Sequence, residues 1–185
     1  MLLARSEATT DYAAPIIATV EGLHEGGLDR DDLILDGSGV LALYGIRAPR
    51  DADFIVRPSV FDELRAARQT PDGMMLRTII GRTGRMRVYL QSVNEPEPGR
   101  LPIHIKTFER GDREEQFEAL RSRVTYSDKV RIAHFSLEQM HFLKTHDSRR
   151  TKDRVDAFRI ARHVGKPVLQ ASWLALGRGK FLVNS

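Results

Sequence analysis

Two aspartates separated by one residue are the clearest candidates for a chemical role in the sequence. Asp51 and Asp53 precede the apolar run 54–56, and the alternation predicts a strand over residues 51–56. Alternate residues of a strand point to the same face, so both carboxylates would be directed at one point. Hard divalent cations prefer carboxylate oxygens, so the pair predicts a Mg²⁺ site that Mn²⁺ could also fill.

A glycine–serine turn precedes this pair by twelve residues. Gly37 and Ser38 follow the apolar strand predicted at 33–35 and come before a short helix predicted at 40–44. Glycine allows a tight turn and close approach of a ligand, and a serine hydroxyl with free amides at a helix start can hold a phosphate. Phosphates beside a metal-binding acid pair are typical of metal-assisted phosphoryl or nucleotidyl transfer.

A second charged group lies later in the chain. Lys144 ends an amphipathic helix that Ser136 would cap, where its ammonium could reach a triphosphate. Asp153 and Asp156 share one face of the next predicted helix. Taken alone, these residues favour a simpler interpretation, a solvated helix on which Lys152 and Asp156 form an i,i+4 pair.

Together the two segments resemble one family. Leu35-Asp36-Gly37-Ser38, twelve residues, then Asp51-Ala52-Asp53 is similar to the signature of the nucleotidyltransferase fold of the DNA polymerase beta superfamily. Lys144, then Arg149 or Arg150, then Lys152-Asp153-x-x-Asp156 resembles its AbiEii-like branch, which includes toxins of toxin–antitoxin systems. The two signatures stand in the family's order.

The resemblance implies a nucleotidyltransferase that moves a nucleoside monophosphate from a nucleoside triphosphate (NTP) to a hydroxyl acceptor with Mg²⁺. It points to a tRNA end or other RNA as acceptor, and to a toxin with a cognate antitoxin. Two alternatives stay open: a degenerate member that binds nucleotide or RNA without turnover, and an enzyme acting on an antibiotic or sugar hydroxyl. The implied metal ligands are Asp51 and Asp53, the implied catalytic residues are Asp51, Asp53, Lys144 and Asp153, and the implied nucleotide-binding residues are Gly37, Ser38, Arg50, Lys144, Arg150 and Lys152.

The sequence departs from the family pattern at a third carboxylate. Many enzymes of this fold carry one on a later strand, but the strand predicted at 103–108 offers His104 and Lys106 at its polar positions. His104 could serve as base or ligand, although a solvent-facing histidine is the simpler interpretation. The sequence therefore leaves open which residue acts as the general base and whether a second metal binds. The acids near this strand are Glu95, Glu97 and Glu109.

Two other interpretations compete for the first segment. Residues 37–42 match the dinucleotide-binding pattern G-x-G-x-x-A, which expects an acid at the end of the second strand. Here the acids open that strand and Arg57 follows its end, which disfavours this interpretation. Alternatively, Asp51 pairs with Arg47 or Arg50 at an ordinary surface turn.

The remaining pattern indicates the elements that position these residues. We expect an α/β (α+β) fold, with a mixed-sheet nucleotidyltransferase core in residues 1–130 flanked by helices and a helical segment in 131–185, packed as one unit. Further predicted elements are helices at 13–26 and 61–68 (N-cap Ser59), paired strands at 74–80 and 85–91, a loop at 94–102, a helix up to Gly165 that carries Val155, Phe158, Ile160 and Ala161, and a helix or strand from Pro167.

Composition narrows the class of protein. The chain has 185 residues, 41% hydrophobic and 29% charged, which predicts a globular protein. The absence of cysteine excludes disulfides, a thiolate zinc site and a cysteine nucleophile, and fits a reducing cytoplasm.

The charge is distributed unevenly along the chain. Residues 1–99 carry 11 Lys/Arg and 15 Asp/Glu, whereas residues 100–185 carry 18 Lys/Arg and 10 Asp/Glu. This distribution favours a cleft where carboxylates face a polyanion. The N-terminus does not resemble a signal peptide and no apolar window approaches the ~18 residues of a membrane span, so we expect a cytoplasmic protein with no membrane partner.

Overall fold

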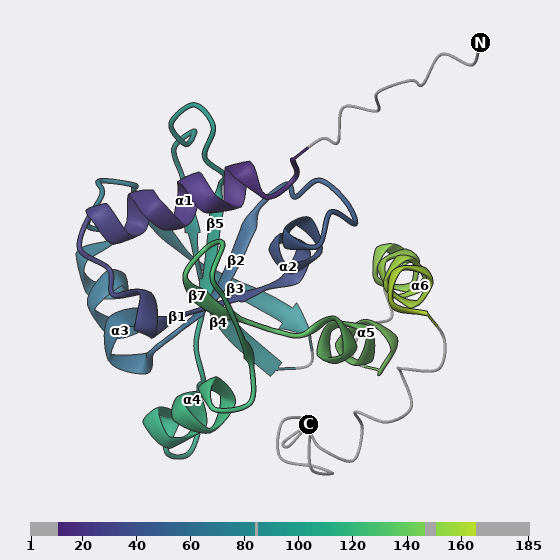
Figure 1. Ribbon diagram of the computed structural model, residues 1–185. Coiled ribbons are helices and arrows are strands. Elements are labelled where there is room, and N and C mark those ends of the chain that lie inside the picture. Colours follow the sequence, from purple (N-terminus) through teal and green to yellow (C-terminus); the bar gives the residue numbers. More distant parts are fainter. Residues whose placement is uncertain (1–10, 84, 147–150, 166–185) are drawn as a thin grey trace.

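A seven-stranded mixed sheet forms the centre of the molecule, in the order β3-β4-β5-β2-β1-β7-β6 (Figure 1). The computed structural model describes residues 11–83, 85–146 and 151–165. The expectation of a mixed α/β chain is confirmed. The strands are β1 Leu33–Asp36, β2 Ala52–Val56, β3 Leu76–Thr83, β4 Arg85–Ser92, β5 Ile103–Lys106, β6 Thr125–Ser127 and β7 Ile132–His134. Within the described residues the helices are α1 Ala14–Glu25, α2 Gly37–Leu43, α3 Pro58–Ala67, α4 Arg113–Arg121, α5 Leu137–His146 and α6 Thr151–Val164, with a 3-10 turn, η1, at Arg30–Asp32.

Strand pairing fixes which residues can meet. β1 and β2 pair antiparallel, with Asp36 opposite Asp53. β5 then pairs parallel with β2, and β7 pairs parallel with β1. A dinucleotide-binding unit requires two parallel strands joined through the intervening helix. The antiparallel β1–β2 pair shows that the dinucleotide interpretation of residues 37–42 is wrong.

The two faces of the central strands differ in burial. One face carries the fully buried side chains Ala52, Phe54 and Val56 of β2 and Ile103 and Ile105 of β5. Helices α1 and α2 approach this face closely: a Cβ on Gly39 would lie 2.8 Å from Leu35 Cδ1 and 3.0 Å from Ile16 Cδ1. Leu35 is the register partner of Phe54. The opposite face holds Asp53, Ile55, His104 and Lys106, which are only half-buried.

Helices α5 and α6 lie together at one end of the molecule (Figure 1). The predicted cap of α5 is confirmed: Ser136 Oγ accepts the Gln139 backbone N–H at 3.2 Å, and Gln139 Oε1 accepts the Ser136 N–H at 2.7 Å. The helix predicted up to Gly165 is α6, and its apolar residues differ in burial. Val155 and Phe158 are exposed, whereas the buried positions are Asp153, Asp156, Ala157 and Ile160.

Several predicted boundaries need correction. The helix predicted at 40–44 begins at Gly37, and Asp51 lies just before β2 rather than within it. Ser59 is not an N-cap, because α3 already begins at Pro58 and the Ser59 N–H donates to Glu114. The strand predicted at 103–108 ends at Lys106.

Four elements were not predicted: α4, β6, β7 and the 3-10 turn η1. β7 has only three residues, too few to show a period, yet all three are buried and pair with β1 or β6. Because β7 lies beyond residue 130 and belongs to the sheet, the helical part begins at α5. The tail from Pro167 lies outside the described residues. None of the described helices is both long and apolar enough to cross a membrane.

Phe54 offers a direct test of this core. Its ring is fully buried at the centre of β2, so Phe54→Ala should lower the free energy of unfolding by about 3–5 kcal/mol in urea titrations. Val93→Ala, at a site 56% exposed, should change it by less than about 0.5 kcal/mol. Equal effects would contradict the assignment of Phe54 to the core.

Candidate functional site

A row of polar residues crosses five strands on the half-buried face of the sheet. The strand registers place Asp36 opposite Asp53, Asp53 beside His104, His104 opposite Gln91, and Gln91 opposite Arg77. Register partners lie on the same face of a sheet. These five residues form what we call the polar row, and it includes Asp53 of the predicted acid pair.

The two predicted carboxylates converge on one atom. His104 Nδ1 lies 3.6 Å from Asp51 Oδ2 and 3.4 Å from Asp53 Oδ1. The three side chains are about one-third exposed, so solvent and ligands can reach them. His104 is therefore a partner of the acid pair and is also partly exposed to solvent.

Gly37 makes the approach to Asp53 possible. Its φ is +65°, a conformation that residues with side chains rarely adopt, and a Cβ there would lie 2.3 Å from Asp53 Oδ2. Ser38, the next residue, donates from Oγ to Asp51 Oδ1 at 3.2 Å. The predicted glycine–serine turn thus contacts both aspartates. The Gly37 N–H donates to Asp36 at 2.6 Å, so a phosphate at this turn would have to exchange these bonds.

The electrostatics of the site favour negative charge on Asp53 and positive charge on His104. Burial raises the pKa of Asp53, but the hydrogen bond from His104 and the positive charges of Lys106 and Lys144 outweigh it, so the pKa is lowered. The hydrogen bond to Asp53 raises the pKa of His104 above its usual value, against burial and the charge of Lys152. Positive charge is therefore stabilised at the point where the two carboxylates meet.

Lys106 supports the same region from β5. Its Nζ pairs with the Asp36 carboxylate, the residue before the glycine–serine turn. Burial lowers the pKa of Lys106, but the charge and hydrogen bond of Asp36 outweigh it, so the pKa is raised. This ion pair ties the end of β1 to β5 across β2.

The second predicted group forms a buried ionic cluster between α5, α6 and the loop after α2. Lys144 Nζ lies 2.6 Å from Asp153 Oδ1 and 3.5 Å from Asp156 Oδ2. Arg47 Nε lies 3.0 Å from Asp156 Oδ1. Asp153 and Asp156 are 0% and 2% exposed, so the solvated-helix interpretation with a Lys152–Asp156 pair is wrong. The alternative in which Arg47 pairs with Asp51 is not found, because Arg47 pairs with Asp156.

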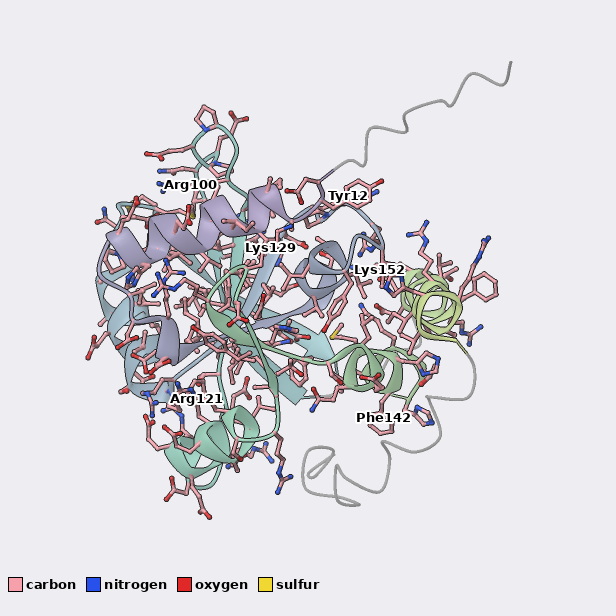
Figure 2. All side chains as sticks on the ribbon, viewed as in Figure 1. Tyr12, Arg100, Arg121, Lys129, Phe142 and Lys152 are labelled. Carbon is pink, nitrogen blue, oxygen red and sulfur yellow. The ribbon has the colours of Figure 1, made fainter. Side chains whose placement is uncertain are left out.

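The remaining predicted residues differ in position. Lys152, at the start of α6, lies on the side turned toward α2 (Figure 2), and its charge lowers the pKa of His104. Arg50 is exposed in the loop before β2. Arg149 and Arg150 lie outside the described residues. The structure thus brings the α6 start and the acid pair within electrostatic range of each other.

The donor set fits a magnesium ion that also binds phosphates. Mg²⁺ is commonly held by one or two carboxylates, with substrate phosphates and water completing six ligands. Asp51 and Asp53 supply such a pair. In the part of the chain that the structure describes, no group of three or more His, Asp or Glu residues could hold a metal by itself. The other acids considered face elsewhere: Glu109 accepts the Val88 N–H at 2.8 Å and Glu97 binds Arg100 at 3.1 Å.

Two contacts of the candidate site were not predicted from the sequence: Lys106 with Asp36, and Arg47 with Asp156. The first had a usable signal, because Lys106 follows His104 by two residues and so shares its face. The second pairs residues 109 positions apart, and nothing local predicts it.

Comparisons with protein-family models, with curated proteins and with solved structures find no match to this chain. Its fold family and activity are therefore argued from its own residues.

Gly37→Ala tests the contact beneath the turn. Both Gly37 and Gly45 have φ near +65° to +70°, but a Cβ on Gly45 would meet nothing within 4 Å. Gly45→Ala should cost about 1–2 kcal/mol from backbone conformation alone. Gly37→Ala should cost more in urea unfolding, because its methyl group also displaces the Asp53 carboxylate. Equal losses in the two variants would show that the turn does not contact Asp53.

The coupling of His104 to Asp53 has a pH signature. Because its pKa is raised in the folded state, the stabilisation from this contact is full below the unfolded value of about 6.5 and is lost as pH rises through the folded value. NMR titration should find the His104 pKa above 6.5 in the wild type and closer to it in Asp53→Asn. Asp62→Asn, on α3, should leave it unchanged. An unshifted wild-type value would exclude the coupling.

Proposed function

We propose that this chain is a Mg²⁺-dependent nucleotidyltransferase that transfers a nucleoside monophosphate from an NTP to a hydroxyl acceptor. The observation that carries the proposal is the convergence of Asp51 and Asp53 beside the Gly37–Ser38 turn. Support comes from Lys144, close enough to lower the pKa of Asp53. These residues, together with Lys152, Asp153 and Asp156, resemble the two signatures of the nucleotidyltransferase fold and its AbiEii-like branch.

In the proposed reaction the acceptor oxygen bonds to the α-phosphorus, the bond from that phosphorus to the α–β bridging oxygen breaks, and pyrophosphate leaves. Asp51 and Asp53 would hold Mg²⁺, which when bound neutralises phosphate charge and polarises the phosphoryl oxygens. His104 competes with a cation for the same carboxylate oxygens. Once released from them, it can accept the proton of the attacking hydroxyl.

The basic groups have separate tasks in this proposal. Lys144 neutralises the β- and γ-phosphates. Asp153 is fully buried, and its Oδ1 lies 2.6 Å from Lys144 Nζ, so it positions the ammonium group. Ser38 exchanges its bond to Asp51 for a phosphate oxygen. Lys152, Arg50 and Arg150 add positive charge around the nucleotide.

A specific observation favours a second candidate, a degenerate member of the fold that binds nucleotide without turnover. The position beside Asp53 on β5 carries His104, where many enzymes of this fold carry a third carboxylate. A histidine brings positive charge rather than a metal-binding anion to this position. Binding of NTP·Mg²⁺ without any product would identify this candidate.

The activity test uses NTPs labelled at the α-phosphate, with Mg²⁺ and total RNA or small hydroxyl compounds. Wild type should transfer label, and Asp53→Asn should reduce the rate by about 10² or more, because it removes charge stabilisation at the reacting phosphate. Asp62→Asn, which alters an exposed aspartate bound to Arg113, should retain full activity. If wild type neither transfers label nor binds NTP·Mg²⁺ in calorimetry, the proposal fails.

A further inference from the structure

A surface cavity of about 450 Å³ lies between α6 and the loop after α2. Its described lining consists of Gly45, Ile46, Arg159, Arg162 and His163. Sites for small molecules commonly have volumes of about 300–1,000 Å³, so the cavity has room for one. The described lining contains three basic side chains and no acidic one. The cavity is therefore suited to an anion.

The cavity is separate from the acid pair. Helix α2 begins at Gly37, beside Asp53, and Gly45 follows the opposite end of this helix. At 1.5 Å per residue, the two glycines are about 12 Å apart along the helix axis. No lining residue of the cavity belongs to the proposed catalytic machinery. A ligand in the cavity would therefore occupy a second site.

One face of α6 supplies the basic side chains of the cavity. Arg159, Arg162 and His163 follow an i, i+3, i+4 spacing, which makes them neighbours on the helix surface. Basic residues in the last turn also stabilise the negative end of a helix, and Arg162 and His163 lie in that turn. Arg159 lies before the last turn, so the helix end does not account for its place in the lining.

The charge of the two arginines is available to a ligand. Arg159 Nη1 lies 3.9 Å from Asp156 Oδ1, a long ion pair, and the Arg159 side chain is 48% exposed. Asp156 already binds Arg47 at 3.0 Å and lies 3.5 Å from Lys144, so it does not neutralise Arg159 as well. Arg162 is exposed, and no carboxylate in the described part of the chain pairs with it. Both guanidinium groups can therefore turn to an external anion.

We propose that this cavity binds an oligophosphate through Arg159 and Arg162. Guanidinium groups bind phosphate oxygens in bidentate geometry, and two neighbouring ones can contact successive phosphates of one molecule. His163 adds a further hydrogen-bond donor, and Ile46 supplies an apolar wall. Free pyrophosphate and the triphosphate of a nucleotide share this chemistry. The inference does not rest on the proposed function, because neither a metal nor the acid pair takes part.

Calorimetry with pyrophosphate in metal-free buffer tests the site. Without a metal the two aspartates repel phosphate, so the acid pair does not contribute. Wild type should bind pyrophosphate, and R159Q/R162Q should bind it at least about tenfold more weakly, because two charged hydrogen-bond donors are lost. The charge-matched variant R65Q/R110Q, changed at exposed arginines elsewhere, should bind like wild type. ATP in the same buffer distinguishes the two sources: tighter binding of ATP identifies a nucleotide, and tighter binding of pyrophosphate identifies the free anion.

A matched pair of variants at Gly45 tests the charge of the cavity alone. A Cβ on Gly45 would meet nothing within 4 Å, and Asn and Asp both tolerate its φ of +69°. The two side chains have nearly the same shape, but only Asp adds a negative charge to the lining. Gly45→Asp should therefore bind pyrophosphate about fivefold or more weakly than Gly45→Asn. Urea unfolding of both variants verifies that they are folded.

Four outcomes would overturn the inference. Wild type could bind neither pyrophosphate nor ATP in metal-free buffer, R65Q/R110Q could weaken binding as much as R159Q/R162Q, the two Gly45 variants could bind equally, or wild type could bind an acidic peptide and no oligophosphate. Transfer of label and binding of NTP·Mg²⁺ are separate measurements. Their failure in wild type would overturn the proposed function, whereas failure of pyrophosphate binding in metal-free buffer would overturn only this inference.

Discussion

The position of the Gly37 backbone against the Asp53 carboxylate is the constraint on which the rest of the site depends. A side chain at Gly37 would lie within 2.3 Å of an Asp53 oxygen, so only glycine allows the approach. The antiparallel β1–β2 register sets this contact by placing Asp36 opposite Asp53. The left-handed turn at Gly37 then starts α2 at a point where Ser38 reaches Asp51. Changes that shift this register would therefore move the turn and both acids together.

Charge compensation holds the surrounding elements around this turn. His104 contacts both carboxylates from β5, and Lys106 pairs with Asp36 from the same strand. The cluster of Lys144, Arg47, Asp153 and Asp156 joins α5 and α6 to the loop after α2. Removing one member of a buried cluster leaves its partner charged and unsatisfied. These ionic contacts therefore fix the position of Lys144 relative to the acid pair, and the proposed catalytic role of Lys144 depends on that position.

The two faces of the sheet carry different kinds of side chain: one face forms the core and the other carries the candidate site. The face under α1 is filled with apolar side chains, while the polar row crosses the other face. Strand alternation allows this division because neighbouring residues serve opposite faces. The polar row ends at Arg77 of β3, so the proposed catalytic residue Asp53 shares one face of the sheet with polar residues of four other strands.

The sequence by itself determined the local features: the Asp51–Asp53 pair, the glycine–serine turn, the capped α5, the β3–β4 strand pair and the shared face of Asp153 and Asp156. Each depends on strand or helix periodicity or on the backbone freedom of glycine, which act over a few residues. Only the tertiary structure decided that His104 contacts both acids, that Lys106 pairs with Asp36 and that Arg47 pairs with Asp156. It also decided that α6 buries carboxylates and exposes Phe158, and that three-residue β7 belongs to the sheet. These outcomes depend on strand register and on partners distant in the chain, and no local pattern encodes either.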